Sequence, residues 1–349
     1  MSRHPSSEAV SWTRSAIARQ LDRPLLELVF EAATVHRRYH DSREVQVSSL
    51  ISIKAGGCPE DCSYCPQAAR YQTGVKRHGL LAVDDVLEHA RKAKKGGASR
   101  ICMGAAWREV REGKDFDQVV KTVTAVKDMG MEVCCTLGML TDEQAQRLKD
   151  AGLFAYNHNI DTSPEYYGDV ISTRGFDDRL QTLGSVRKAG LTVCSGGIIG
   201  MGESREDRAG MLAVLAALDP PPESVPINAL VPVAGTPYGE REKIDGLELV
   251  RMIATARIVL PKARVRLSAG RKDLSEAEQA MCFLAGANSI FAGEKLLTTP
   301  NPEFADDLRL FDKLGLRAAA AYSQPGLAAE QIPHSQAAAT GTAGEAPSP

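Results

Sequence analysis

The sequence predicts an α/β fold: a TIM-type (β/α)8 barrel with N-terminal helices and a disordered C-terminal tail. Several helical stretches end in glycine and are followed at once by a short β-branched run, as at Gly97, Gly130, Gly152, Gly190 and Gly286. Glycine is favoured just past a helix because it readily adopts the left-handed conformation. Eight candidate strands alternate with the helices, and this alternation implies a parallel sheet. They cover residues 47–53, 99–103, 131–136, 153–159, 191–195, 224–230, 263–268 and 288–291. An open, doubly wound sheet is the structural alternative.

The segments before and after the barrel differ in composition. Residues 10–40 predict one or two helices, with Leu25, Leu28, Val29 and Ala32 at helical spacing after Pro24. Residues 323–349 consist mainly of Ala, Gly, Pro, Ser and Thr, too few large apolar groups to order a segment. We therefore expect a helical extension at 1–44, the barrel at 45–322 and a disordered tail at 323–349.

Composition argues against several partners. The chain has 349 residues, with 42 basic and 44 acidic side chains and a net charge of -2. This balance gives no basic field for nucleic acid, and the apolar runs are too short to span a membrane. The first 20 residues lack the apolar core of a signal peptide, so we expect a cytoplasmic protein. In a reducing compartment, eight cysteines more often bind metal or do chemistry than form disulfides.

Three cysteines follow the first predicted strand, where the catalytic face of a barrel lies. Cys58, Cys62 and Cys65 have the spacing C-x3-C-x2-C. Iron–sulfur cubanes are held by cysteine thiolates, normally four, so three thiolates would leave one iron open to a substrate. A structural zinc site is the alternative, although zinc usually takes four closed ligands and no fourth ligand lies nearby.

Three further cysteines fall on separate predicted strands. Cys102, Cys134 and Cys194 lie within or near the ends of their strands, and Arg266 lies on another. Inward-facing residues of neighbouring barrel strands stack in layers, so these groups could converge on the axis. The pattern alone supports this interpretation and ordinary buried cysteines equally well. The neighbouring Cys135 should then point outward, and Cys282 should pack in the core.

Polar residues alternate at the end of the fourth predicted strand. Asn157, Asn159 and Asp161 share one face at strand spacing, which predicts a hydrogen-bonding wall. Further along, Thr298 and Thr299 precede a helix expected to start near Pro302, and a helix start with nearby hydroxyls favours anions. A plain helix cap is an equally good interpretation of the two threonines.

Longer motifs carry a resemblance. The three-cysteine motif after the first strand of a barrel resembles the radical S-adenosylmethionine (SAM) superfamily. The segments CMGAAW, YNHNIDTSPEYY, CSGGIIGMGE, PPESVPIN, VRLSAGR and KLLTTPNPE resemble the biotin synthase family, in family order over about residues 20–317. The resemblance implies a sulfurtransferase that forms biotin from dethiobiotin, using 5′-deoxyadenosyl radicals from SAM.

The resemblance also implies cofactors and site residues. A [4Fe-4S] cluster would bind Cys58, Cys62 and Cys65, and a [2Fe-2S] cluster would bind Cys102, Cys134, Cys194 and Arg266. SAM would contact Tyr64, Asn159, Asp161 and Arg179. Dethiobiotin would contact Asn157, Asn159 and Asn228 through its ureido ring, and Thr298 and Thr299 through its carboxylate. An electron donor such as flavodoxin and a homodimer are implied by the family.

Two other functions compete with this one. Another radical SAM enzyme could insert sulfur elsewhere or build a different cofactor, but a lipoyl-type enzyme should show a second three-cysteine motif. An iron–sulfur carrier is more distant, because a carrier would need neither a full barrel nor the polar wall.

Overall fold

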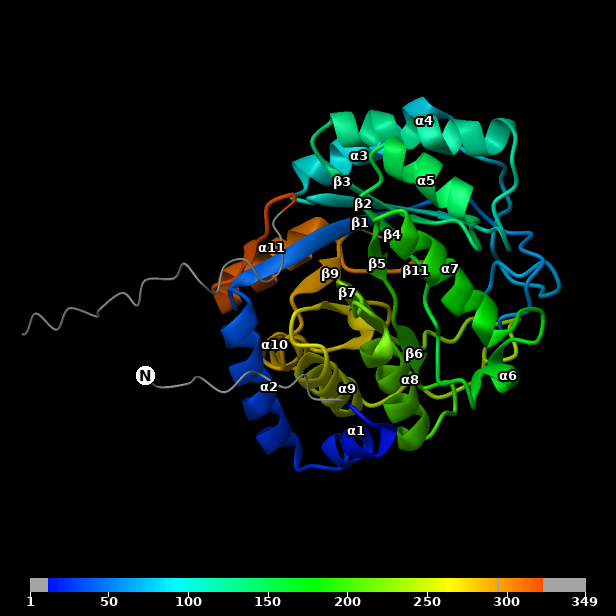
Figure 1. Cartoon of the computed structure of the whole chain (residues 1–349). Coiled ribbons are helices and arrows are strands. Elements are labelled where there is room, and N and C mark those ends of the chain that lie inside the picture. Colours follow the sequence, from blue (N-terminus) through cyan, green and yellow to red (C-terminus); the bar gives the residue numbers. More distant parts are fainter. Residues whose placement is uncertain (1–11, 294, 323–349) are drawn as a thin grey trace, which may run out of the picture.

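The computed structural model describes residues 12–293 and 295–322, and its strands form a closed barrel (Figure 1). The strand order is β1-β2-β3-β4-β5-β7-β8-β9, every neighbouring pair is parallel, and β9 pairs back with β1. The predicted barrel is therefore confirmed, and each of the eight expected strands overlaps one of its strands. The strands are β1 (Glu44–Lys54), β2 (Arg100–Ala105), β3 (Glu132–Thr136), β4 (Ala155–Asn157), β5 (Thr192–Cys194), β7 (Ser224–Ala229), β8 (Arg264–Leu267) and β9 (Ser289–Phe291).

Helices surround the barrel (Figure 1). The capping boxes at Thr141 and Ser275 begin α5 and α10. Gly286 follows α10 with φ +103°, and a Cβ there would lie 2.6 Å from Arg257 Cγ, so glycine is required by both conformation and space. The helices are α1 (Arg14–Leu21), α2 (Leu25–Tyr39), α3 (Val83–Lys95), α4 (Lys114–Asp128), α5 (Asp142–Asp150), α6 (Tyr167–Val170), α7 (Phe176–Lys188), α8 (Arg205–Ala217), α9 (Gly246–Val259), α10 (Glu276–Leu284) and α11 (Phe304–Leu314), with a 3-10 turn η1 (Arg271–Asp273).

Four short strands were not expected from the sequence. β6 (Gly197–Ile199) pairs with β7, and β12 (Arg317–Ala318) pairs with the start of β1. β10 (Lys295–Leu296) and β11 (Thr299–Pro300) form an antiparallel hairpin after the last barrel strand. These strands have two or three residues each, too few to show a period. The tail expected at 323–349, and the first 11 residues of the expected extension, lie outside the described residues.

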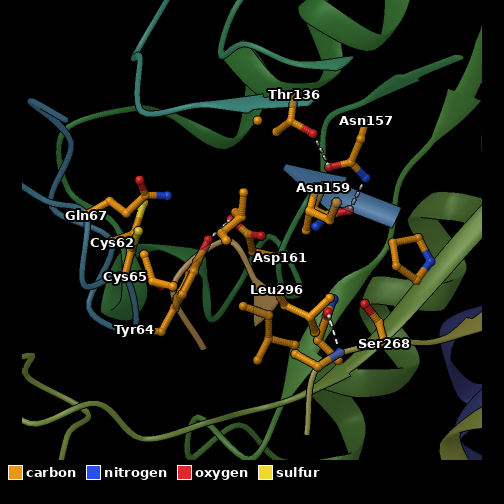
Figure 2. A pocket seen from close by; sticks show the side chains of 18 of the residues that line it. Cys62, Tyr64, Cys65, Gln67, Thr136, Asn157, Asn159, Asp161, Ser268 and Leu296 are labelled. Atoms are coloured by element: carbon orange, nitrogen blue, oxygen red, sulfur yellow. Dashed lines mark hydrogen bonds between the residues drawn. The ribbon is translucent and has the colours of Figure 1, made fainter. Parts of the chain in front are cut away.

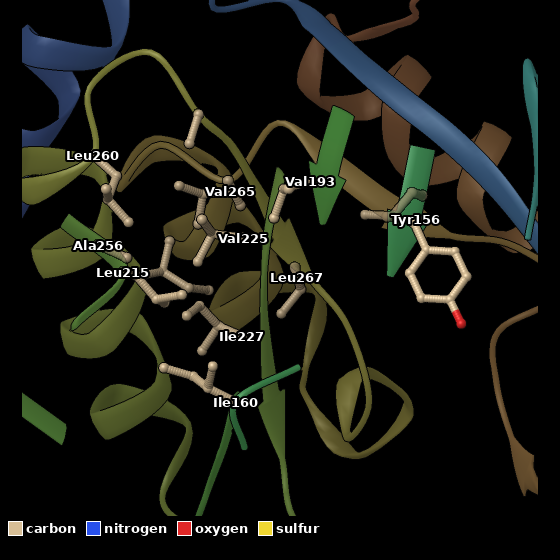
Figure 3. Close-up of a cluster of buried hydrophobic side chains, with 14 of the residues drawn as sticks. Tyr156, Ile160, Val193, Leu215, Val225, Ile227, Ala256, Leu260, Val265 and Leu267 are labelled. Carbon is tan, nitrogen blue, oxygen red and sulfur yellow. The ribbon is translucent and has the colours of Figure 1, made fainter. Parts of the chain in front are cut away.

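The apolar core lies between the strands and the helices (Figure 3). Successive residues of a strand point to opposite faces, so Val265 and Leu267 of β8 point outward and pack near Leu215 of α8. The residues that alternate with such apolar residues along the strands point into the barrel. Many of them are polar, among them Arg266 of β8. The barrel axis is therefore lined by groups that can bind a ligand.

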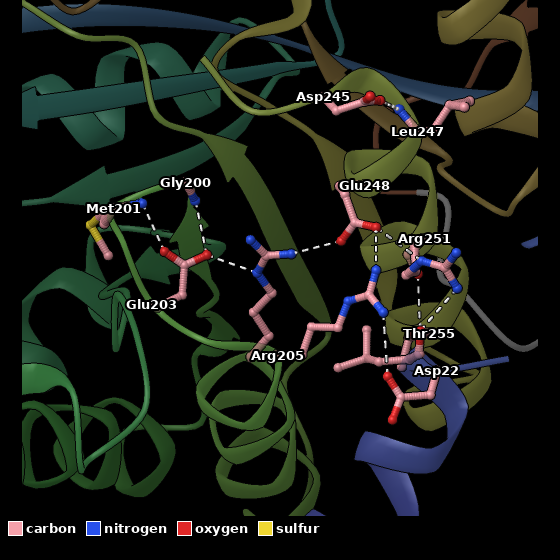
Figure 4. A network of polar contacts seen from close by, with 12 residues as sticks. Asp22, Gly200, Met201, Glu203, Arg205, Asp245, Leu247, Glu248, Arg251 and Thr255 are labelled. Carbon is pink, nitrogen blue, oxygen red and sulfur yellow. Dashed lines mark hydrogen bonds and ion pairs between the residues drawn. The ribbon is translucent and has the colours of Figure 1, made fainter. Parts of the chain in front are cut away.

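The N-terminal helices are bound to the barrel by polar contacts (Figure 4). α1 packs on α8, and α2 packs on α9. Arg205 of α8 reaches Asp22 Oδ1 at 3.3 Å and Glu248 Oε1 at 2.6 Å. Arg251 of α9 donates to the carbonyls of Leu21 and Arg23 at 2.9 and 2.6 Å. Across the described residues, none of the helices combines the length and apolar character needed to cross a membrane.

The N-terminal mouth of the barrel has a floor of side chains. The Arg100–Glu132 ion pair is buried there, with Arg100 Nη2 2.6 Å from Glu132 Oε2. Tyr322 lies beneath it: its backbone N–H donates to Glu132 Oε1 at 2.6 Å, and its ring meets Phe154 edge to face. The last described residues thus close the end of the barrel opposite the catalytic face.

Candidate active site

One cavity of about 330 Å³ lies among the C-terminal ends of the barrel strands (Figure 2). Of the residues predicted from the sequence, all but one line it. They are Cys58, Cys62, Tyr64, Cys65, Cys102, Cys134, Asn157, Asn159, Asp161, Arg179, Asn228, Arg266, Thr298 and Thr299. The exception, Cys194, lies just behind the wall, with its sulfur 3.2 Å from Asn157 Nδ2. The fold therefore brings both cysteine sets and the polar wall to one space.

The three-cysteine loop follows β1 and is folded back on itself. Cys58 donates its backbone N–H to Gln67 O at 3.0 Å and accepts from Ala69 N at 2.7 Å, while Cys65 N donates to Cys62 O at 2.9 Å. Burial raises the pKa of Cys62, and it raises the pKa of Cys65 to about 11. These groups are thus thiols at neutral pH unless iron replaces their protons.

The first cysteine set has the chemistry that a cubane needs. Burial and the Asp161 carboxylate raise the pKa of Cys62, and Arg179 and Arg174 partly offset this, so cations lie near the sulfur where a thiolate would form. Within the described part of the chain, no three His, Cys, Asp or Glu groups converge closely enough to bind one metal ion. The thiolates of a cluster bind different iron atoms, so they need not converge on one point.

The second set meets inside the barrel. Cys102 and Cys134 are paired in register on β2 and β3, and both point inward, while Cys135 packs in the outer core. A hydrogen bond between their sulfurs lowers the pKa of Cys102 and raises that of Cys134. Cys194 approaches from β5, and Arg266 Nη1 from β8 lies 3.9 Å from its sulfur. Cys282, by contrast, lies in the apolar core.

Arg266 is held in place by neutral groups. Its Nε donates to Ser289 Oγ at 2.9 Å, its Nη2 donates to Gln46 Oε1 at 3.2 Å, and its guanidinium lies over the Phe291 ring. The side chain is 1% exposed, and among the described residues no carboxylate forms an ion pair with it. A buried cation of this kind fits an anionic group held by the three cysteines.

The polar wall is oriented by its neighbours (Figure 2). Thr136 Oγ1 donates to Asn157 Oδ1 at 3.1 Å, and Asn157 Nδ2 donates to Asn159 Oδ1 at 3.1 Å. Gly196 N also donates to Asn159 Oδ1 at 3.2 Å. The two amides are therefore fixed in direction, and Asn228 is fixed likewise through Gly197 O at 3.0 Å.

Asp161 joins the cysteine loop to α7. Tyr64 of the loop donates its hydroxyl to Asp161 Oδ2 at 3.0 Å, and Arg179 Nη2 donates to the same oxygen at 2.5 Å. Arg179 also donates to Asn159 O at 2.8 Å and to Tyr167 OH at 2.9 Å. Arg179, which the sequence analysis expects to contact SAM, therefore also binds Asp161, a second expected SAM contact.

The two threonines lie on the β10–β11 hairpin, just before α11. The helix expected near Pro302 begins at Phe304 and is capped by Glu303, so the interpretation of a threonine as its cap is wrong. Thr299 Oγ1 donates to Leu296 O at 3.3 Å, and both threonines line the cavity. Asn301 Nδ2 anchors the hairpin by donating to the carbonyls of Phe291, Gly293 and Pro302 at 2.9–3.3 Å.

Sequence reasoning missed two acids inside the cysteine motif. Glu60 and Asp61 are buried, and both contact the segment just before α7. Burial alone would raise the pKa of Asp61, but hydrogen bonds from Ser172 and Thr173 outweigh it and hold the pKa at about 2. The sequence signal for this contact was a pair of acids between apolar and cysteine neighbours. From the sequence alone, such a pair is interpreted as part of a solvated loop.

A parallel (β/α)8 barrel with three cysteines after its first strand and a polar wall beside them defines the radical SAM class of enzymes. Residues 52–215 match the Radical SAM superfamily, and residues 226–317 match the Biotin and Thiamin Synthesis associated domain. Sequence relatives narrow the assignment. The chain is 62% identical to the biotin synthase of Flavobacterium johnsoniae over 88% of this chain and 84% of that protein. It is 61% identical to that of Cytophaga hutchinsonii over 93% and 97% of the two chains. The chain belongs to the biotin synthase family.

Solved structures support the fold alone. Methylornithine synthase (PylB) superposes with a TM-score of 0.75 at 19% identity, over 88% of this chain and 94% of that one. The FeFe-hydrogenase maturase HydG of Carboxydothermus hydrogenoformans gives 0.73 at 16% identity, over 88% and 76%. At these identities, the likeness confirms the barrel and says nothing of the substrate.

Proposed function

We propose that this enzyme forms biotin by inserting one sulfur atom into dethiobiotin; the name of its relatives, biotin synthase, supports the product. The observation that carries the proposal is one cavity lined by the first cysteine set, by Cys102, Cys134 and Arg266, and by the oriented polar wall, with Cys194 just behind it. Identity near 60% over most of the chain supports the same substrate. By the same argument, we propose a cytoplasmic homodimer that takes electrons from a carrier such as flavodoxin.

The cofactors fit the two cysteine sets. Cys58, Cys62 and Cys65 would hold a [4Fe-4S] cluster, and Cys102, Cys134, Cys194 and Arg266 would hold a [2Fe-2S] cluster. When bound, the first supplies the electron that splits SAM into methionine and a 5′-deoxyadenosyl radical, and the second supplies the sulfur. Two C–H bonds of dethiobiotin become two C–S bonds, so two hydrogen atoms leave and two SAM molecules are consumed.

The chain's own residues would bind and orient both substrates. Asp161, held by Tyr64 and Arg179, would accept hydrogen bonds from the ribose hydroxyls of SAM. Arg179 keeps further N–H donors for the SAM carboxylate, because only part of its guanidinium is used by the protein. Tyr64 would lie near the adenine. The barrel walls would exclude water from the radical and hold the reacting carbon close to it.

Dethiobiotin would be held at both of its ends. Asn157, Asn159 and Asn228 offer amide groups to the ureido ring. Thr298 and Thr299 offer hydroxyl and backbone groups to the carboxylate from the β10–β11 hairpin. The two ends of the substrate would thus be recognised by different elements, which sets its position along the cavity.

Product analysis tests the proposal. Reconstituted, reduced protein should convert SAM to 5′-deoxyadenosine and dethiobiotin to biotin, with about two nucleosides per biotin. Cys58→Ser should abolish both products, because an iron of the first cluster loses its thiolate. An iron–sulfur carrier would release no 5′-deoxyadenosine. A radical enzyme with another substrate would release it without forming biotin, and either result would refute the proposal.

A further inference from the structure

Two carboxylates lie inside the three-cysteine loop and face away from the cavity. Glu60 is 3% exposed and Asp61 is 7% exposed. Burying carboxylates is costly unless partners compensate, so acids rarely lie at such depth without them. Neither residue lines the cavity, and neither belongs to the proposed ligand or substrate contacts. Their burial therefore serves something other than direct binding.

Asp61 is bound mainly by the segment that precedes α7. Its Oδ1 accepts from the backbone N–H groups of Ser172 and Thr173 at 3.0 and 3.1 Å. Its Oδ2 accepts from the Ser172 hydroxyl and from Arg70 Nη1. In return, the backbone N–H of Asp61 donates to Thr173 Oγ1 at 3.1 Å. Such charge-assisted bonds are about twice as strong as neutral ones.

Glu60 completes the same contact. The Thr173 hydroxyl also reaches Glu60 Oε2, so one hydroxyl lies between the two carboxylates. Arg108 and Arg174 approach Glu60 Oε1 at 3.6 and 3.7 Å and balance its charge. We call Glu60, Asp61, Ser172 and Thr173 together the acid clamp.

The acid clamp connects the two elements that meet at Asp161. The loop continues from Asp61 to Tyr64, and the segment continues from Thr173 into α7 and Arg179. Tyr64 and Arg179 both donate to Asp161 Oδ2. The loop and α7 are thus joined twice, once at the clamp outside the cavity and once at Asp161 inside it. A shift at the clamp must move Tyr64 relative to Arg179.

We infer that Glu60 and Asp61 are positioning residues, which hold the cysteine loop against α7 and so set the geometry in which SAM binds. The inference rests on the proposed function, since it takes the cavity beside Tyr64 and Asp161 as the SAM site. It differs from a purely structural role in one respect. A structural clasp would change stability, whereas a positioning clamp changes SAM affinity and the signature of the first cluster.

Thr173→Val tests the inference with little change in shape. Valine removes the hydroxyl from both carboxylates and from the Asp61 N–H. We expect SAM to bind about 10–100-fold more weakly, as when the outer partners of metal ligands are lost. The electron paramagnetic resonance spectrum of the reduced first cluster should also change, while the absorption of the second cluster should not. Thr173→Ser keeps the hydroxyl and should restore both.

Thr255→Val is the matched control. Thr255 is fully buried, whereas Thr173 is half-buried, so the same substitution removes a hydroxyl from a site at least as sensitive to packing. Thr255 lies on α9, and its hydroxyl donates to Arg251 O. This variant should bind SAM as the wild type does. Asp61→Asn is a second test of the clamp, because the amide oxygen can still accept the two backbone N–H groups. Its SAM affinity should lie between those of Thr173→Val and the wild type.

Two results would overturn the inference. In the first, Thr173→Val and Asp61→Asn both bind SAM with the affinity of Thr255→Val and show an unchanged spectrum. In the second, they disturb both clusters to the same degree, as a general loss of stability would. Neither measurement requires biotin to form. If the wild type bound and cleaved SAM without making biotin, the proposed function would be refuted, but the inference about the acid clamp would not be affected.

Discussion

The floor of the barrel offers a sharp test of buried electrostatics. In the Arg100–Glu132 pair, the side chains are 4% and 1% exposed, and Arg100 Nε and Nη2 lie 2.7 and 2.6 Å from Glu132 Oε2. Burial alone would lower the pKa of Arg100, but the carboxylate outweighs it and raises that pKa. Glu132→Gln removes this charge and leaves the guanidinium buried without a counter-ion.

The magnitude follows from what a glutamine side chain keeps. Removing one partner of a buried ion pair costs about 3–5 kcal/mol. Gln46 and the N–H of Tyr322 donate to different oxygens of Glu132, and the amide introduced by Glu132→Gln keeps only one of them, so one further donor loses its acceptor. We therefore expect a loss near the upper end, about 5 kcal/mol. Adding Arg100→Met removes the orphaned charge, and the double variant should recover to within about 1–3 kcal/mol of the wild type, the cost of the donor that stays unpaired.

Urea unfolding of the reduced, cluster-free protein measures both changes as shifts in midpoint. Glu88→Gln serves as the control, since Glu88 forms an exposed pair with Lys92 at 2.6 Å, and it should leave the midpoint unchanged. The reasoning fails if Glu132→Gln unfolds like the wild type. It fails equally if Arg100→Met deepens the loss when added, because the cost would then not lie in the unpaired charge.

Three further predictions concern cluster binding, pH and packing. Cys58→Ser should lose the iron of the first cluster and keep that of the second, whereas Cys135→Ser should keep both, as iron analysis and Mössbauer spectra would show. His40 has its pKa lowered to about 3 by burial and a neighbouring guanidinium, so the unfolded chain takes the proton first. Above about pH 6.5, His40 is neutral in both the folded and the unfolded chain and costs no stability. As the pH falls toward 3, the free energy of unfolding declines by up to about 1.4 kcal/mol per pH unit. His40→Gln should flatten this slope in urea titrations, and an equal slope would contradict the assignment. Gly196→Ala places a Cβ 2.0 Å from a backbone oxygen and should cost about 1–3 kcal/mol or more in thermal unfolding, whereas Gly168→Ala meets nothing within 4 Å and should cost far less.

The barrel could be predicted because its signals are local and repeated. Each unit carries a helical stretch, a glycine past its end and a β-branched run. A wrong assignment in one unit therefore does not change the predicted fold. The two-residue period of a strand showed that only one of Cys134 and Cys135 could point inward, and the family resemblance selected Cys134. The short strands β6, β10 and β11 could not be predicted, because none of them follows a helix that ends in glycine, the signal that marked the equally short β4, β5 and β9.

The candidate site was predictable as a set of residues, but not as a set of contacts. Motifs marked Arg179 and Asp161 separately, and only the fold shows that they bind each other. The helix after Thr298 and Thr299 was predicted, but the β10–β11 hairpin that carries them was not, because its two-residue strands are too short to show a period. Ser172 and Thr173, which bind Glu60 and Asp61, are more than 110 residues away along the chain, beyond any local pattern.

The side chains at the N-terminal mouth of the barrel bear on when a used cluster could be rebuilt. Phe154, Tyr322 and the ion pair above them lie at the N-terminal mouth, whereas the cavity lies among the C-terminal ends of the strands. Under the proposed function, iron and sulfide destined for the inner cysteines would then share their entrance with dethiobiotin, and bound dethiobiotin would bar it. Cluster rebuilding and turnover would alternate, so an enzyme that had used its cluster sulfur would release its product before a new cluster could form.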